Sequence, residues 1–297
     1  MNLIVSLNSQ NYKFLEIILI YDAEHKIEYD LMENYIKSFE YIKLINNKYK
    51  KGKLYSIYKG VSIAKGKYLL ILNQNCFFLR YDAFKNINEE IIKEDADIIE
   101  MDLYIIVQSN YMNLYKCKHF ASSFNVNSIK YNLEFNDLDI KNELLTNKLI
   151  KSKFFQNSIK KYKIDFSSII INHYYNHIFN FIIDSTIHEF KHISSANIYI
   201  NDSNVDKYIF HDFNSEKNQA LDEILFYINF IFDNSENTYE SKQKVLKEFF
   251  TFLSVIFNKF TKVSESQINL FNKFMRCKYI SQEQKTLLKF YYDSLIC

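Results

Sequence analysis

The first hundred residues alternate between short apolar runs and segments with helical periodicity, and this alternation constrains the fold most. Apolar runs at 15–22, 41–47 and 67–73 have the length and composition of buried parallel strands. Between them, residues 27–40 and 53–66 place apolar side chains at helical spacing. The order strand, helix, strand, helix, strand is typical of a mostly parallel sheet with flanking helices. We therefore predict an α/β fold whose ligands bind beyond the carboxyl ends of the strands.

After residue 80 the alternation continues and then gives way to helices. We predict helices at 81–94, 142–158 and 170–185, strands at 96–106 and 193–202, and helices at 217–233, 241–260, 265–276 and 281–295. The best domain junction lies at 212–216. It divides the chain into an α/β domain, residues 1–212, and an α-helical C-terminal region, residues 213–297.

Turn signals are scarce because the chain has no proline and only three glycines. Gly66 is one of them. It follows the periodic segment 53–66, and we expect it to cap the C-terminal end of that helix.

Composition and charge give no support for a nucleic-acid-binding or membrane-spanning protein. The 37 Lys and Arg residues against 35 Asp and Glu give a net charge of +2, which offers no argument for a nucleic-acid partner. The lysines at 48, 50, 51 and 53 are typical of a solvated face. No signal peptide is visible, and no apolar run approaches the ~20 residues that a membrane span needs. We expect a cytoplasmic protein, with a C-terminal region that packs on the core, forms a homodimer or contacts the inner membrane peripherally.

The cysteines predict no metal or disulfide site. The four are Cys76, Cys117, Cys277 and Cys297, and none is part of a CxxC pair. Reduced thiols are therefore expected. Cys76 could in principle be a nucleophile, but no partner histidine is identifiable from the sequence.

Polar side chains follow two of the predicted strands. Asp22 closes the first strand, and Asn73, Gln74 and Asn75 follow the third. In a parallel sheet these positions share one edge. The amides could satisfy the backbone of a turn, contact a phosphate or ribose, or hold a metal ion.

Two stretches around these residues resemble the family 2 glycosyltransferases, which have the GT-A fold. The first is "LNSQNYKFLEIILIYD", in which Leu7, Gln10, Tyr12, Glu16, Ile17, Ile18 and Asp22 match the family pattern. The second is "KGVSIAKGKYLLILNQN", in which Gly60, Ala64, Gly66, Tyr68 and Leu72 match at fixed spacing. "LTNKLIKSKFF" resembles the segment before the acceptor-side helix of the family. The resemblance covers roughly residues 1–200.

The sequence also departs from the family pattern. The opening strand with its "PTYN" loop is expected to be absent, because only eleven residues precede Tyr12. The aspartates of the metal-binding pair fall on Asn73 and Asn75. The Arg-Asn pair before Gly60 is Ile57-Tyr58, and the Glu-Asp pair that supplies the base falls on Asn176-His177.

The resemblance implies a nucleotide-sugar donor and a glycan or glycolipid acceptor. It implies that Asp22 binds the nucleotide base, that Asn73, Gln74 and Asn75 face the diphosphate, and that His177 is the candidate catalytic base. Mn²⁺ and Mg²⁺ prefer anionic oxygen ligands, so with two amides in place of two carboxylates we expect no metal site and little metal dependence.

Other interpretations stay open at this stage. His173 and His177 could be structural histidines or, four residues apart, a metal-binding pair. The whole chain could be a degenerate, inactive transferase that acts as a binding partner, or an unrelated α/β binding module. The resemblance and the A/T-rich codon composition implied by abundant Asn, Ile and Lys favour an enzyme of bacterial surface polysaccharide biosynthesis.

Overall fold

The computed structural model describes residues 2–23, 25–93, 95–108, 112–116, 145–162, 164, 170–171, 178–179, 182, 190–201, 223, 226–227, 229–234, 265–276, 278 and 280–296. The chain forms two compact units. The first combines residues 1–130 with 139–209, and the second combines residues 131–138 with 210–297.

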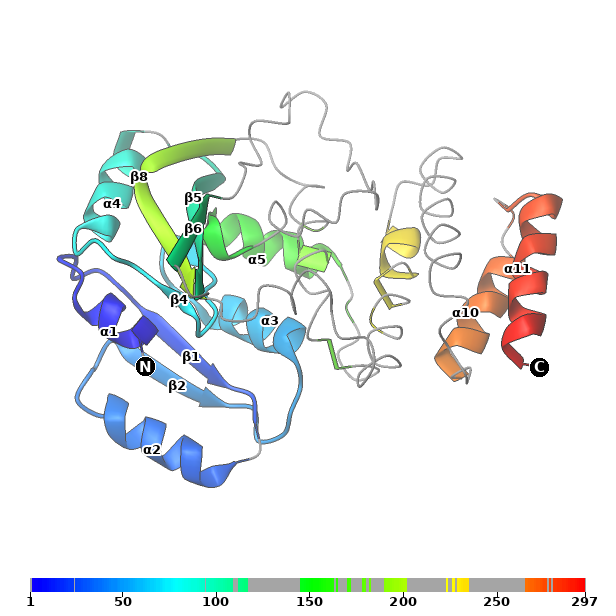
Figure 1. The fold of residues 1–297 in the computed structure, drawn as a ribbon, viewed down its shortest axis with the longest axis horizontal. Coiled ribbons are helices and arrows are strands. Elements are labelled where there is room, and N and C mark those ends of the chain that lie inside the picture. The colour runs from blue at the N-terminus through cyan, green and yellow to red at the C-terminus, as the bar shows by residue number, and fades with distance from the viewer. Residues whose placement is uncertain are drawn as a thin grey trace. The chain divides into compact units, whose positions relative to one another are not determined.

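A strand–helix–strand unit near the start of the chain builds the edge where Asp22 lies. Strands β1 (Ile17–Tyr21) and β2 (Ile42–Asn46) pair in parallel, and helix α2 (Lys26–Ile36) connects them. Figure 1 shows the two strands side by side with α2 next to β2. Because the strands are parallel and in register, with Tyr21 opposite Asn46, the residues that follow them leave the sheet at the same edge.

Helix α3 (Lys53–Ile63) returns from this edge and packs against β1. The contact is close at Gly60, where an added Cβ would lie 3.1 Å from Cδ1 of Ile20. The predicted cap at Gly66 is wrong. The helix ends at Ile63 because Ala64 adopts an extended conformation, with ψ of 139°, while its N–H still reaches the carbonyl of Gly60. Gly66 has no positive φ.

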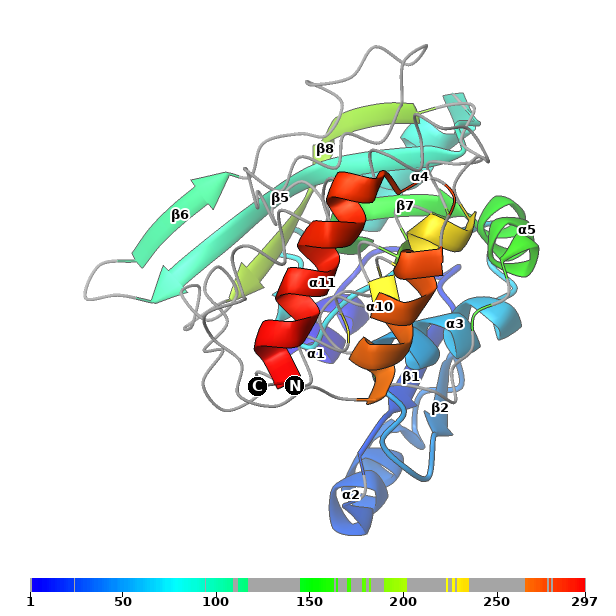
Figure 2. The same ribbon diagram turned by 90° about the vertical axis from the view of Figure 1, so that its right-hand side faces the viewer.

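The larger sheet contains six strands. Its strands are β3 (Tyr68–Leu70), β4 (Cys76–Phe77), β5 (Ile98–Gln108), β6 (Met112–Lys116), β7 (Lys148–Lys151) and β8 (Phe190–Asn201). The order is β3-β7-β5-β8-β4, and β6 pairs with β5. Strands β5 and β8 are parallel, and the other pairs are antiparallel. Figure 2 shows β5 as the long central strand of this sheet.

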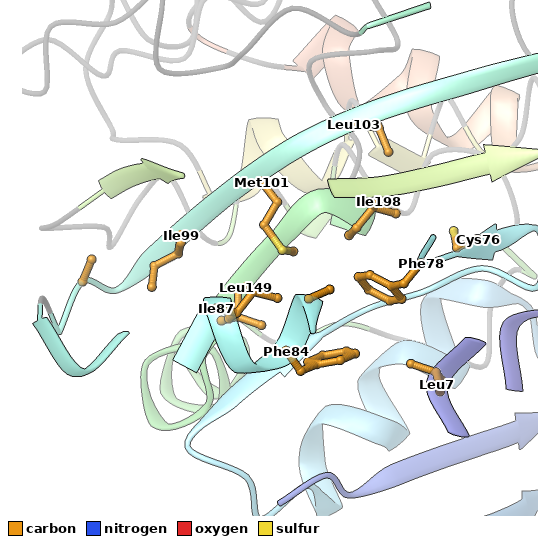
Figure 3. Close-up of a cluster of buried hydrophobic side chains, with 12 residues drawn as sticks. Leu7, Cys76, Phe78, Phe84, Ile87, Ile99, Met101, Leu103, Leu149 and Ile198 are labelled. Carbon is orange, nitrogen blue, oxygen red and sulfur yellow. The ribbon is translucent and has the colours of Figure 1, made fainter. Parts of the chain in front are cut away.

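An apolar cluster covers one face of the six-stranded sheet. Helix α4 (Ala83–Lys93) and the short helix α1 (Asn2–Asn8) contribute to it, and the rings of Phe78 and Phe84 lie 4.9 Å apart. Ile99, Met101 and Leu103 point into this cluster from alternate positions of β5 (Figure 3). The intervening residues of β5 therefore face the opposite side of the sheet.

The helix predicted at 142–158 is wrong for its first half. A 3₁₀ turn (Leu145–Asn147) leads into β7, and helix α5 (Ser152–Lys161) begins only afterwards. Strand β7 lies between β3 and β5, so hydrogen bonds from both sides favour an extended backbone there. Helix α5 is fixed to the preceding elements by Gln156, whose side-chain amide donates to the carbonyls of Val61 and Ala64.

The second unit contains helices α10 (Glu265–Arg276) and α11 (Gln282–Ile296), which confirm the helices predicted at 265–276 and 281–295. The ammonium of Lys273 contacts the carboxylate of Asp233 at 2.6 Å, and the rings of Phe232 and Phe274 lie 5.1 Å apart. In the described part of the chain, every helix is too short or too polar to cross a membrane.

Candidate functional site

Asp22 lies directly after β1, and its carboxylate organises the loop that precedes α3. One carboxylate oxygen, Oδ1, accepts hydrogen bonds from the side-chain amide of Asn47 at 2.9 Å and from the backbone N–H of Lys51 at 2.7 Å. The other oxygen, Oδ2, accepts from the backbone N–H of Gly52 at 2.7 Å. Asp22 was predicted to belong to a polar cluster because it follows a parallel strand at its carboxyl end. The structure places such a cluster there, with Asp22 at its centre.

Asn47 connects this carboxylate to α3. Its amide nitrogen donates to Asp22 and to the hydroxyl of Ser56 at 3.0 Å, and its amide oxygen accepts from the ammonium of Lys59 at 3.0 Å. Asn47 is 8% exposed, so these hydrogen bonds satisfy a nearly buried side chain. Sequence reasoning missed Asn47 and Lys59. The strand-end rule that found Asp22 also applies to Asn47, because Asn47 directly follows β2.

Gly52 holds the loop close to a distant part of the chain. Its φ is +87°, a conformation that side chains with a Cβ rarely adopt. An added Cβ would lie 2.8 Å from the carbonyl oxygen of Ile171, to which the N–H of Leu54 donates at 3.1 Å. The loop is therefore fixed on one side by Asp22 and on the other by the backbone of Ile171.

Asn73, Gln74 and Asn75 form the turn that joins β3 to β4. The backbone carbonyl of Asn73 accepts from the N–H of Cys76 at 3.0 Å, and its side-chain amide donates to the hydroxyl of Thr146 at 3.4 Å. Gln74 and Asn75 are exposed. No hydrogen bond joins this turn to Asp22 within the described residues, so the two predicted parts of the site are separate clusters in the hydrogen-bond network.

The nucleophile interpretation of Cys76 is excluded by its environment. The residue is 0% exposed, and burial raises the pKa of its thiol from 9.0 to about 12. The thiol therefore stays protonated at neutral pH, and the reactive thiolate is not formed. Cys76 acts as a small core residue in the apolar cluster (Figure 3).

A second group of polar residues lies on the face of β5 opposite the apolar cluster. Glu100 and Asp102 are 1% and 3% exposed. The side-chain amide of Asn147 donates to Oε1 of Glu100 at 3.4 Å and to the carbonyl of Met101 at 3.1 Å. Its Oδ1 has no hydrogen-bond partner among the described residues. Sequence reasoning missed Asn147 because residues 142–158 were expected to be a helix, and it did not single out Glu100 or Asp102 in the strand predicted at 96–106.

The described residues contain no group of three or more His, Cys, Asp or Glu side chains that could hold a metal ion. The predicted base His177 and its neighbours His173 and Asn176 lie outside the described residues. Their role stays a prediction.

Comparison with known proteins shows the family. Residues 2–156 match the model of glycosyl transferase family 2. The S. aureus TarS fragment 1–349 in complex with UDP has a TM-score of 0.58 and 10% identity, over 99% of this chain and 83% of that chain. The structure described as S. aureus TarS has a TM-score of 0.57 and 12% identity, over 99% of this chain and 50% of that chain. No curated protein matches. The α/β, GT-A-like fold is confirmed, and because the matched residues exceed half of the 297, the chain belongs to glycosyl transferase family 2.

Proposed function

We propose that this glycosyltransferase moves a sugar from a nucleotide-sugar donor to a hydroxyl of a glycan or lipo-oligosaccharide acceptor, with little or no metal dependence. Asp22 carries the proposal. Its carboxylate stands at the shared end of β1 and β2, where ligands of α/β sheets bind.

Asp22 retains capacity for a ligand. A carboxylate has about four acceptor positions, and among the described residues Asn47, Lys51 and Gly52 use three of them. A ring N–H of the donor base would take the remaining position. Because the TarS fragment was solved with UDP, uracil is the first base to test.

The turn at 73–75 would contact the diphosphate through neutral amides. Two carboxylates at this turn would attract a divalent cation. Replacing them with amides removes Coulomb attraction on the order of several kcal/mol in a partly buried site. Amide N–H groups of exposed Gln74 and Asn75 can still donate to phosphate oxygens. Metal independence follows from this difference in charge.

The acceptor side of the proposal rests on the family. His177 would take the proton of the acceptor hydroxyl as the sugar is transferred and the nucleoside diphosphate leaves. We place the reaction at the cytoplasmic side of a bacterial inner membrane, in surface polysaccharide assembly. The helical C-terminal region would pack on the core, form a homodimer or contact the membrane peripherally.

A second candidate is a catalytically inactive family member that acts as a binding partner. The two amides at 73 and 75 favour it, because they remove the family's carboxylate pair. A nucleotide titration separates the two candidates. The melting temperature would be followed with UDP, GDP and CMP, each with manganese and with EDTA. An increase of several degrees in EDTA is expected for the enzyme. The same melting temperature with every nucleotide would favour the inactive protein.

A further inference from the structure

The segment that carries the Asp22 loop has an unusual charge. Residues 41–81 contain eight lysines, one arginine and no acidic residue, so this segment carries +9. The whole chain carries +2, and the remainder therefore carries −7. The positive charge of this segment lies on β2, the loop after it, α3 and the residues between α3 and β3, with Arg80 following β4. A positive potential of this kind attracts anionic ligands.

Lys51 contacts Asp22 through its backbone N–H, whereas Lys59 is linked to Asp22 through its side-chain ammonium and Asn47. Lys59 lies in the second turn of α3, and its ammonium reaches back to the amide oxygen of Asn47 at 3.0 Å. The same amide donates to Asp22 at 2.9 Å. Lys59 and Asp22 are therefore held by opposite ends of one side-chain amide, and Asn47 sets the position of both.

The ammonium of Lys59 is not neutralised by a carboxylate among the described residues. It has three N–H donors, and one is used by Asn47. The ring of Tyr55 lies 5.9 Å from the nitrogen and leaves the donors available. A half-buried cation that is fixed in place and lacks a carboxylate partner is suited to binding an anion.

We propose that Lys59 is a phosphate-binding residue of the donor site and supplies positive charge that a metal ion would otherwise bring to the diphosphate. The proposal rests on the proposed function, because it assumes that a nucleotide binds at Asp22. A nucleotide that placed its base on the Asp22 carboxylate would bring its phosphates toward the Lys59 ammonium, which Asn47 joins to Asp22. Lys59 then offsets the diphosphate charge without Mn²⁺ or Mg²⁺.

The experiment compares a nucleoside diphosphate with its nucleoside. The dissociation constants of UDP and uridine would be measured by calorimetry in EDTA for the full chain and for the variants Lys59→Met, Lys59→Arg and Lys43→Met. Lys43 is an exposed lysine of the same basic segment and serves as the matched control. We expect Lys59→Met to weaken UDP binding about tenfold or more and uridine binding less than about twofold. Lys59→Arg should bind UDP with nearly the affinity of the unchanged chain. Lys43→Met should leave the dissociation constants of both UDP and uridine unchanged.

Salt dependence provides a second readout. If Lys59 contacts a phosphate, UDP binding to the unchanged protein should weaken with salt more steeply than UDP binding to Lys59→Met. The thermal stability of each variant is measured in parallel, and Lys59→Gln replaces Lys59→Met if the latter does not fold.

The outcomes separate this proposal from the proposed function. Equal losses for UDP and uridine would mean that Lys59 only positions Asn47, and unchanged UDP binding would mean that Lys59 plays no part; either result overturns the phosphate contact while nucleotide binding stands. A full chain that binds none of UDP, GDP and CMP, with or without manganese, would instead overturn the proposed function, and this proposal with it.

Discussion

Asp22 accepts a hydrogen bond of 2.7 Å from the backbone N–H of Gly52, thirty positions later in the chain. This bond and its partner from Lys51 tie the loop before α3 to the end of β1. The carboxylate proposed to bind the donor base therefore also shapes the loop around it. Substitutions at either residue test the scaffold before any ligand is added.

Asp22→Asn should destabilise the protein. The amide that replaces one carboxylate oxygen cannot accept a hydrogen bond, so a backbone N–H of Lys51 or Gly52 loses its partner. Hydrogen bonds to charged groups contribute about 1.5–3 kcal/mol, and we expect a loss of about 1–3 kcal/mol in the free energy of unfolding, measured by urea denaturation. Asp30→Asn, on the exposed side of α2, is the control. Equal unfolding midpoints for the two variants would contradict the role of Asp22 in the loop.

Gly52→Ala should destabilise the protein more than Gly60→Ala. At Gly52 the new methyl group meets backbone atoms of Ile171 at 2.8 and 2.9 Å, and φ is +87°. Such strain costs about 1–3 kcal/mol. At Gly60 the nearest atom is the flexible Cδ1 of Ile20 at 3.1 Å, and alanine favours the helix by about 1 kcal/mol. Thermal unfolding of the two variants measures the difference. A Gly52→Ala protein as stable as the unchanged chain would show that the loop is not held against Ile171.

The double change Asn73→Asp and Asn75→Asp should create manganese-dependent UDP binding. Two carboxylates would then occupy the turn between β3 and β4, and Mn²⁺ prefers anionic oxygen ligands. Calorimetry with and without manganese measures the gain. Asn34→Asp on α2 serves as the control for an added charge. If manganese leaves UDP binding to the double variant unchanged while the unchanged chain binds UDP, the turn does not face the diphosphate.

Cys76 should resist alkylation in the folded protein. Its pKa of about 12 and its complete burial leave almost no thiolate at about pH 8. Peptide mapping after iodoacetamide treatment should find Cys76 unmodified in the native protein and modified in urea. Rapid native modification would mean that β4 opens.

The same pKa has a consequence for stability. Because the thiol pKa is higher in the folded state than its ordinary value of 9.0, Cys76 favours folding fully below about pH 9, and this contribution is lost as the pH rises toward 12. Cys76→Ala should therefore flatten the fall in stability at alkaline pH, as measured by urea denaturation across that range. A Cys76→Ala protein with the same alkaline profile would contradict a buried thiol at this position.

Local patterns predicted the first unit well. The strands at 15–22 and 41–47 and the helices at 27–40 and 81–94 correspond to β1, β2, α2 and α4, because their apolar periodicity is read directly from neighbouring residues. Strand β7 was not predicted. Its extended backbone depends on pairing with β3 and β5, about eighty and fifty positions away, and helical spacing of its side chains gives no sign of those partners.

The candidate site was predicted only in part, because some of its residues follow from local order along the chain and others depend on long-range contacts. Asp22 follows from the rule on strand ends, which needs only the order of elements. The rule does not predict Lys59, because the role of Lys59 depends on the contact that the fold creates between Asn47 and the side chains of α3. The hydrogen bond between Asn73 and Thr146 could not be predicted either, because Thr146 lies 73 positions later in the chain, on a 3₁₀ turn that only the fold brings close to Asn73.

The alternation along β5 separates two kinds of selection on one strand. Changes at Ile99, Met101 or Leu103 alter packing in the apolar cluster and would be removed for loss of folding. Changes at Glu100 or Asp102 act on the opposite side of the sheet, where both side chains are buried and interact with neighbouring groups. Substitution on either face of β5 therefore carries a cost in folding, through lost packing on one side and unsatisfied polar groups on the other.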